Sequence, residues 1–480
     1  MAAILQGLRL DRAPPRQRLA ALTLPVVMIT TLLHALGLVD SLAALGHVAL
    51  VLYIWAEWPQ LPTITRFLVG AAVTGAVAVP FLRDNPWPIW QSGFERAAYY
   101  ATYMTALGFL REAAETSALV RRCGHLVINQ PPAKRYLTLT SGTLLFGIIL
   151  NLGVTNLLGV MITRSNTLQA AGGHEEVRQA RQRRMSVALL RGFALTPMAS
   201  PLSISLAVVL ANLTSLRWYD LLPLGIGLAA LLMAFGWWLD RRAAPRHLAG
   251  LVPQRREQQS FKPFLQFAGL VAAIVGLALA VELLLHAPLT LAILVSAPLI
   301  SVAWLAVQRK RHGPVKAVRY ALTRLGRRST HMFPSLRAEV TILGSAGFTG
   351  VILTALLPPQ AIPETLAALH ISGPALIVAV LAVLTLAAQI GLNPIVMVTL
   401  LASALHTPEP LGVSAQVLGL TFMAGWGLAI NASPVTASVL LLARMAGVTP
   451  ATVGYRWNGM FTLGGFVLLS LVLVGLNVVL

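Results

Sequence analysis

Apolar runs of about 20 residues recur along the whole chain, and this repetition constrains the fold more than any other feature. A helix of about 20 apolar residues crosses a hydrocarbon core of roughly 30 Å and satisfies its own backbone hydrogen bonds. The runs therefore predict an all-α polytopic membrane protein. The expected helices cover residues 19–38, 40–56, 66–83, 97–119, 184–213, 218–239, 263–285, 287–307, 334–358, 412–445 and 456–479.

The charge content agrees with this prediction. Only 11% of the residues are charged, against roughly 25% in a soluble domain, which excludes a soluble globular protein. The net charge of +20 comes from basic residues in short loops between the apolar runs. Such loops are typical of the cytoplasmic side of a membrane protein, so we expect no nucleic-acid partner. The single cysteine, Cys123, excludes an intrachain disulfide and a cysteine metal site.

Two apolar stretches, 138–165 and 371–406, are interrupted near their middle by polar, helix-weakening residues. Lys and Arg flank the first stretch on both sides, so both of its ends are expected in the cytoplasm. The segments flanking the second stretch contain no Lys or Arg, so both of its ends are expected outside. Each stretch is therefore predicted to be a re-entrant hairpin, and the two hairpins enter from opposite faces.

The basic loops also predict the domain organisation. They place the chain in the inner membrane with a cytoplasmic N-terminus and a periplasmic C-terminus. Residues 1–39 are expected to form a cytoplasmic N-terminus and an extra first helix, and residues 240–262 a cytoplasmic linker. The segments 40–239 and 263–480 are then two repeats of opposite orientation.

Internal sequence similarity supports the inverted repeat. Residues 191–205 align without gaps on residues 424–438, an offset of 233, and both segments contain Ala-Ser-Pro. A proline in the middle of the membrane removes a backbone N–H and frees carbonyl groups. Helices 184–213 and 412–445 are therefore predicted to be broken. The prolines concerned are Pro197, Pro201 and Pro434.

The two hairpin tips and the two broken helices are expected to meet near the middle of the membrane, where protein should enclose Thr155, Asn156 and Asn393. Half-helix N-termini offer N–H groups to an anion, and half-helix C-termini offer carbonyls to a cation. Few Asp or Glu residues lie at this depth, which favours sodium at the hairpin tips over a carboxylate proton relay, although proton coupling stays open. The candidate solute- and ion-binding residues are Thr155, Asn156, Thr196, Pro197, Ser200, Pro201, Gln389, Gly391, Asn393, Asn431, Ser433, Pro434 and Thr436.

Arg191 lies about two turns inside the first broken helix, where an unpaired guanidinium costs about 2.5–3.5 kcal/mol. Two interpretations are open: it contacts the negative charge of a solute, or it extends to the cytoplasmic surface. In the first case, Arg191→Gln should raise the apparent KM for an anion about tenfold, or about 1.4 kcal/mol. Other charges near helix ends, such as Glu112 and Glu115 with Arg111, are interpreted as interfacial pairs, and 316–328 as a basic interfacial helix.

At these positions the chain resembles the ion transporter superfamily, and most closely its divalent anion:sodium symporter family, over about 40–479. That family has two inverted repeats, each with a hairpin tipped by Ser-Asn-Thr and a helix broken at a sequence like Thr-Pro-Pro. The corresponding tips here read Val154-Thr155-Asn156 and Leu392-Asn393-Pro394, and the breaks read Ala199-Ser200-Pro201 and Ala432-Ser433-Pro434.

The resemblance implies solute and ion contacts at Asn156 and Asn393 of the tips and at the Ser-Pro pairs of the breaks. It also implies an elevator mechanism, in which the hairpins and broken helices move together against a scaffold able to form a homodimer. Sodium is the only cofactor that it suggests.

We therefore expect a secondary active transporter of a small anionic solute, organic or inorganic, coupled to sodium or protons or working by exchange. Its other expected partners are membrane lipids. The alternative is a membrane-embedded transferase acting on a lipid-linked substrate. Such an enzyme presents a catalytic Asp, Glu or His at a membrane face, and the sequence shows no clustered motif of that kind.

Overall fold

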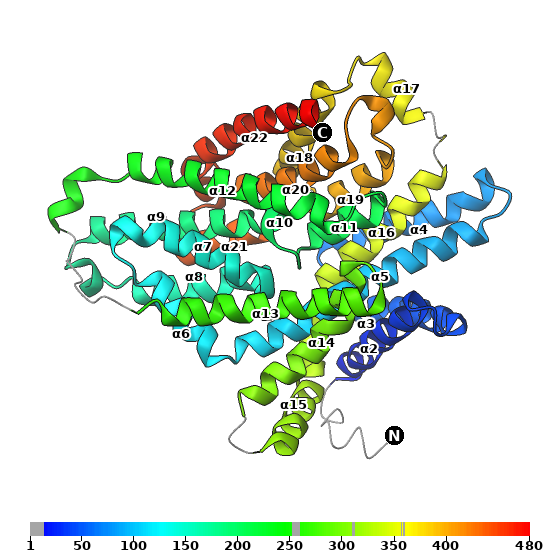
Figure 1. Ribbon diagram of the computed structural model, residues 1–480, viewed down its shortest axis with the longest axis horizontal. Helices are drawn as coiled ribbons and strands as arrows, with labels where there is room; N and C mark the ends of the chain where they lie inside the picture. Colours follow the sequence, from blue (N-terminus) through cyan, green and yellow to red (C-terminus); the bar gives the residue numbers. More distant parts are fainter. Residues whose placement is uncertain (1–13, 252–259, 310–312, 357, 359–360) are drawn as a thin grey trace. The chain divides into compact units, whose positions relative to one another are not determined.

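The chain folds into α-helices joined by short connections, as shown by a computed structural model that describes residues 14–251, 260–309, 313–356, 358 and 361–480 (Figure 1). These residues contain no β-strand. Ten of their helices are long and apolar enough to cross a membrane. The predicted all-α polytopic fold class is confirmed. Most of the predicted N-terminal cytoplasmic segment and much of the linker 240–262 lie outside the described residues.

The helices belong to two compact units, each assembled from distant parts of the chain. Unit 1 consists of the described parts of Met1–Ser117, Ile274–Ile362 and Thr399–Ala404. Unit 2 consists of the described parts of Ala118–Ala273, Pro363–Val398 and Leu405–Leu480. Each unit therefore draws on both predicted repeats. The boundaries of the compact units therefore differ from those of the predicted repeats, because helices from different repeats pack together.

Unit 1 is built around the packing of α5 against α16. Glycines permit close approach on both helices: a Cβ at Gly93 would come within 2.8 Å of the Phe348 ring, and one at Gly347 within 2.7 Å of the Tyr100 ring. The unit also contains the three N-terminal spans that precede α5 and three helices from the second predicted repeat. Its helices are α2 (Pro15–Ala35), α3 (Ala43–Glu57), α4 (Thr63–Leu82), α5 (Trp87–Glu115), α14 (Leu289–Val307), α15 (Pro314–Ser335) and α16 (Arg337–Leu356).

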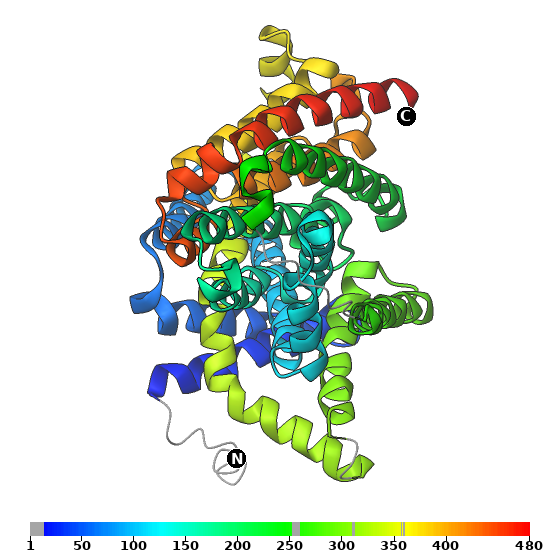
Figure 2. The same ribbon diagram turned by 90° about the vertical axis from the view of Figure 1, so that its left-hand side faces the viewer.

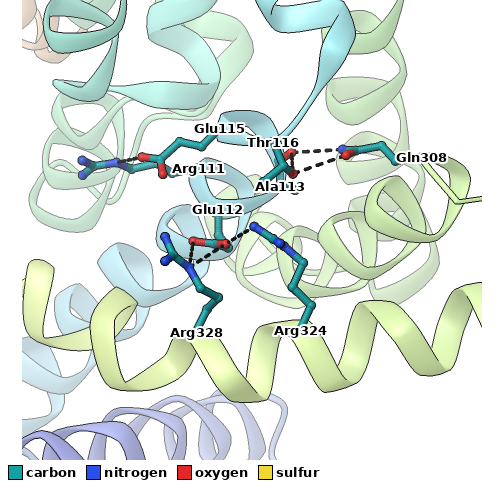
Figure 3. A network of polar contacts seen from close by, with 8 residues as sticks. All are labelled: Arg111, Glu112, Ala113, Glu115, Thr116, Gln308, Arg324 and Arg328. Carbon is teal, nitrogen blue, oxygen red and sulfur yellow. Dashed lines mark hydrogen bonds and ion pairs between the residues drawn. The ribbon is translucent and has the colours of Figure 1, made fainter. Parts of the chain in front are cut away.

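The basic amphipathic segment 316–328 lies within α15, and a buried carboxylate fastens it to α5. Glu112 is 5% exposed and accepts hydrogen bonds from Arg324 Nη2 (3.0 Å) and Arg328 Nε (3.2 Å) (Figure 3). On the next turn, Arg111 and Glu115 form a half-exposed pair within α5 at 3.1 Å. The interpretation of these charges as ion pairs is confirmed, and Glu112 joins two elements instead of pairing within one helix.

We predict that Glu112→Gln lowers the free energy of unfolding by about 1–2 kcal/mol. Removing one partner of a fully buried pair costs about 3–5 kcal/mol, and the partial exposure of both arginines reduces that cost. Thermal unfolding of the purified protein in detergent measures the effect. Glu115→Gln is the matched control and should cost at most about 0.5 kcal/mol, since its pair is exposed. Equal shifts for the two variants would contradict a fastening role for Glu112.

Unit 2 contains both predicted broken helices, the first hairpin and most of the second. Figure 2 shows its C-terminal helix (red) beside α18 and α20 (orange). Its elements are α6 (Ala118–Ile128), α7 (Pro132–Leu150), α8 (Gly153–Ser165), α9 (Glu175–Ala194), α10 (Thr196–Ala199), α11 (Ile204–Asn212), α12 (Trp218–Arg242), a 3-10 turn (Arg246–Leu251), α18 (Pro374–Ala387), α20 (Ala415–Ala432), α21 (Ala437–Ala446), a π-helical segment (Thr452–Trp457) and α22 (Gly459–Val479).

Three helices belong wholly to neither unit: α13 (Lys262–Leu285), α17 (Ala361–Ala368) and α19 (Pro394–Ala404). The predicted spans agree with the observed helices to within a few residues, with two exceptions: α9 begins at Glu175, nine residues before the predicted start at 184, and α5 begins ten residues before the predicted start at 97. Pro88 at the first helical positions sets that start. The sequence patterns missed α6 and α17, because both are shorter than a span.

Candidate substrate site at the hairpin tips and helix breaks

The first hairpin turns at Asn151, between α7 and α8. Asn151 has φ 48° and ψ −132°, a conformation that an L side chain rarely adopts, and its N–H donates to Gly147 O at 2.9 Å. The expected tip residues lie in the first turn of α8 instead. Thr155 is buried and its hydroxyl donates to Leu152 O at 2.7 Å, whereas Asn156 is exposed. The expectation that protein encloses Asn156 is therefore wrong, because its side chain leaves the opposite face of α8 from the buried Val154 and Leu158.

The second hairpin turns at Gly391, which has φ 90° after a 3-10 turn (Ala388–Ile390). Asn393 is half-buried and caps α19, since its Oδ1 accepts the Ile395 N–H at 2.9 Å. Gln389 Nε2 donates to Thr385 O at 2.9 Å, whereas its buried Oε1 has no hydrogen-bond partner in the described part of the chain. The tip therefore presents one unused amide oxygen.

The first broken helix consists of α9, α10 and α11. A kink at Leu195 separates α9 from α10, and Pro197 occupies the start of α10. The helix ends at Ser200, and Pro201 and Leu202 form a turn. The Ser203 side chain then caps α11 by accepting the Leu206 N–H. All residues from Ala199 to Ser203, including Pro201, are buried, so unit 2 encloses this break.

The second broken helix repeats this geometry at the offset of 233 residues. Ser433 ends α20 with φ −84° and ψ 127°, against φ −102° and ψ 123° at Ser200. Each serine hydroxyl accepts the N–H of the residue two positions later, at 3.2 Å in both cases. The helices resume at Ile204 and Ala437, again 233 residues apart. The Ala-Ser-Pro similarity thus corresponds to one local structure that occurs twice.

The two breaks differ in their surroundings. Around the second one, Pro434 and Thr436 are half-buried and Val435 is 49% exposed. The Thr436 hydroxyl donates to Ser433 O at 2.9 Å and to Ile430 O at 3.2 Å, so it does not cap α21. Among the residues that the structure describes, no side chain accepts from the N-terminal N–H groups of α21 at the open break.

Each hairpin contacts one of the breaks. Ser433 Oγ donates to Ala388 O, next to the second tip, at 2.6 Å. A Cβ at Gly147, in the last turn of α7, would come within 2.6 Å of Thr196 Oγ1 in α10. The structure thus brings the second tip to Ser433 and the end of α7 to Thr196. No hydrogen bond joins Ser200 to Ser433 among the described residues, and their use of a common solute stays a prediction.

Some of the buried polar atoms that lack a hydrogen-bond partner among the described residues lie at these points. Asn431 is 0% exposed, and neither its Oδ1 nor its Nδ2 has a hydrogen-bond partner in the described ranges; the same holds for Thr196 Oγ1. Asn431 lies one turn after Gly427 on the same face of α20, and a Cβ at Gly427 would come within 2.5 Å of Ala194 O. Asn431 thus faces the junction of α9 and α10. A buried amide without partners costs roughly 1–3 kcal/mol, which a bound ligand would offset.

Arg191 is bonded inside unit 2. Its side chain is 5% exposed and donates to Asn458 Oδ1 (3.1 Å), Gly236 O (3.2 Å) and Trp457 O (3.4 Å), and its guanidinium carbon lies 4.6 Å from the centre of the Phe461 ring. The guanidinium therefore joins α9 to α12 and to the start of α22. It does not extend to the surface, and these contacts account for its burial without a solute. A direct contact with a solute stays a prediction.

The sequence analysis missed Asn458 and the π-helical segment before it. Asn458 is fully buried; it accepts from Arg191, and its Nδ2 donates to Val453 O at 2.9 Å. Segments of π-helix are rare and are often found at functional sites. The only available signal was one amide at the start of the apolar run 456–479. Asn151 had a comparable signal, an asparagine directly after an apolar run.

The opposite entry of the two hairpins can be tested by cysteine labelling. Burial raises the pKa of the Cys123 thiol to about 12, so the wild-type chain should react little with maleimides. We predict that Ala133→Cys and Gln169→Cys react with a membrane-impermeant maleimide only from the cytoplasmic side. Ser372→Cys and Thr407→Cys should react only from the other side. All four positions are exposed. Labelling of the two ends of either hairpin from different sides would contradict re-entry.

Comparison with known proteins gives matches among solved structures. No family model matches the chain, and no curated protein matches its sequence. Among solved structures, the YdaH transporter of Alcanivorax borkumensis, described as having an unusual topology, is similar with a TM-score of 0.56 and 15% sequence identity. The match covers 85% of this chain and 98% of that one. The chain thus has the fold of a membrane transporter, whereas membership of the divalent anion:sodium symporter family is not established.

Proposed function

We propose that the protein is a secondary active transporter that moves a small anionic solute across the inner membrane, coupled to a sodium or proton gradient or by exchange. The observation that carries the proposal is the pair of unpartnered buried side chains, Asn431 and Thr196, beside two helix breaks of identical geometry. Polar groups buried at such a cost in a membrane protein mark solute or ion sites more often than structural ones. The fold shared with the YdaH transporter supports the same conclusion.

The anionic charge of the solute follows from the open end of α21. Its first N–H groups lack a side-chain acceptor, and a helix N-terminus carries a positive partial charge. A carboxylate or phosphate would accept these N–H groups, while the Asn431 amide would supply both a donor and an acceptor. At the enclosed break near Ser200, the Ser203 side chain already caps α11. This break would therefore form a wall of the solute site and would contribute little positive charge to it.

A coupling sodium ion would take oxygen ligands. The unpartnered Oε1 of Gln389 and the carbonyl groups around Gly391 are of the type that hard cations prefer. They lie at the tip of the second hairpin, next to the break at Ser433. Sodium bound there would join the hairpin to the broken helix.

The two compact units suggest how the transporter works. Every candidate site residue, from Thr155 to Thr436, belongs to unit 2. We propose that unit 2 carries the solute as one body in an elevator mechanism and that unit 1 is the scaffold, which would also form a homodimer. We also propose that the chain spans the membrane with its N-terminus in the cytoplasm and its C-terminus in the periplasm.

Uptake into proteoliposomes tests the proposed function. A panel of labelled carboxylates, phosphates and sulfates would be offered with a sodium gradient, a pH gradient or an internal exchange partner. We expect at least one anion to accumulate above the level of protein-free liposomes. Accumulation of neutral or cationic solutes only would contradict the anionic site. A purified protein that moves no solute but transfers a group to a lipid-linked acceptor would favour the membrane-enzyme interpretation.

A further inference from the structure

Unit 2 contains a second polar region away from the hairpin tips and the helix breaks, a cavity of about 1250 Å³ at the basic end of α9 that Arg191 also lines. We call it the basic cavity. The end of α12, the 3-10 turn Arg246–Leu251, the end of α21 and the start of α22 form its other walls. Leu248 holds the 3-10 turn in place, because it is buried against Ala171 and Val177. The cavity therefore has a packed wall and exceeds the roughly 300–1,000 Å³ of common small-molecule pockets.

Positive charge in the basic cavity greatly exceeds negative charge. Seven arginines line it, against two carboxylates, those of Glu176 and Asp240. Asp240 is already used in a two-point pair with Arg184, at 3.0 and 2.6 Å. The lining arginines are Arg178, Arg183, Arg184, Arg191, Arg242, Arg444 and Arg456.

Three of these arginines, Arg183, Arg444 and Arg456, are solvent-exposed. Within the described ranges, Arg183, Arg444 and Arg456 form no ion pair, side-chain hydrogen bond or ring contact, although they come from three different segments. The charges of Arg456 and Arg191 repel the Arg183 guanidinium, and the charge of Asp240 offsets part of this repulsion. Water screens the repulsion between exposed arginines, and an anion bound among them would offset what is left. Guanidinium groups match phosphate with two parallel hydrogen bonds.

Apolar and aromatic side chains lie in or near the lining of the cavity, a combination found at a membrane–water interface. Met460 lines the cavity and is 72% exposed. At the end of α12, the guanidinium groups of Arg241 and Arg242 lie 4.2 and 4.0 Å from the ring centres of Trp237 and Trp238. Tryptophan and arginine gather at the level of lipid headgroups. A ligand with a phosphate group and an acyl chain fits this combination better than a free anion does.

We infer that the basic cavity binds the phosphate group of an anionic phospholipid, at a site separate from the hairpin tips and the helix breaks. Arg183, Arg444 and Arg456 would hold the phosphate, and the acyl chains would lie along Met460. Basic pockets beside membrane helices bind anionic headgroups by the same physics. Lipid bound there would connect α9, α21 and α22, which carry the two breaks and the Arg191 contacts.

Native mass spectrometry of the purified full chain tests this inference. Cardiolipin, phosphatidylglycerol and phosphatidylcholine would be titrated separately, with pyrophosphate as the soluble phosphate. The test variant is Arg183→Gln/Arg444→Gln/Arg456→Gln. The control variant is Arg122→Gln/Lys134→Gln/Arg164→Gln, which removes three exposed charges of the same unit that do not line the cavity.

We expect the test variant to bind cardiolipin and phosphatidylglycerol at least about tenfold more weakly, and the control within about twofold of wild type. Phosphatidylcholine should bind weakly to all three proteins. Equal lipid affinity of the two variants would overturn the proposal. The wild type could instead bind pyrophosphate but no anionic lipid, and the test variant could lose the pyrophosphate binding. That outcome would overturn the proposal that the ligand is a lipid and would identify a soluble phosphate as the ligand. Solute uptake does not enter this test, so its result is independent of the proposed function.

Discussion

Replacing Asn431 by leucine is expected to abolish transport and to leave the protein at least as stable as the wild type. The Asn431 side chain is fully buried, and neither of its polar atoms has a partner in the described part of the chain. An apolar side chain of similar size removes the cost of that unsatisfied amide. It also removes a donor and an acceptor from the proposed solute site. Each such contact is worth about 1.4 kcal/mol or tenfold, so uptake at low solute concentration should fall at least about a hundredfold.

Uptake in proteoliposomes and thermal unfolding in detergent measure the two effects. Thr421→Val is the matched control, because Thr421 is also fully buried in α20 and its hydroxyl already donates to Val417 O at 2.8 Å. This variant should keep transport within about threefold of wild type, since the hydroxyl bond lies within the helix. Asn431→Leu with normal uptake would exclude Asn431 from the site. Asn431→Leu with a large loss of stability would show that the amide has a structural partner.

Arg191→Gln is expected to lower the free energy of unfolding by about 3 kcal/mol. The substitution leaves two buried carbonyls and one amide oxygen with fewer donors, and each such loss costs roughly 1–3 kcal/mol. It also removes the contact between the guanidinium and the Phe461 ring. Thermal unfolding in detergent checks the size of the loss.

Asn458→Leu separates the structural role of Arg191 from a contact with solute. Asn458 accepts from Arg191 and donates to Val453, so its loss should reproduce much of the destabilisation. A double-mutant cycle should give a coupling energy of about 1 kcal/mol or more. If Arg191 also contacts solute, Arg191→Gln should raise the apparent KM for an anion about tenfold, and Asn458→Leu should leave that KM unchanged. Equal KM values in both variants would exclude the solute contact.

Local features of the sequence determined most of the fold. The length of each apolar run fixes a span, because a helix in lipid must satisfy its own backbone groups. The interruptions in 138–165 and 371–406 produce turns at Asn151 and Gly391 for the same local reason. The Ala-Ser-Pro repeat predicted two breaks, and both occur with matching dihedral angles at Ser200 and Ser433.

Only the tertiary structure decided which polar groups find partners. Arg191 was open to two interpretations in the sequence, because its acceptors Gly236, Trp457 and Asn458 lie 45 to 267 residues away. Asn156 was expected to be enclosed and is exposed, since a one-residue change of register on a helix moves a side chain by about 100°. In the sequence, Asn431 and Thr196 could not be distinguished from the other candidate hydroxyls and amides. Packing alone showed that these two are buried without partners, because satisfaction of a hydrogen bond depends on neighbours distant in the chain.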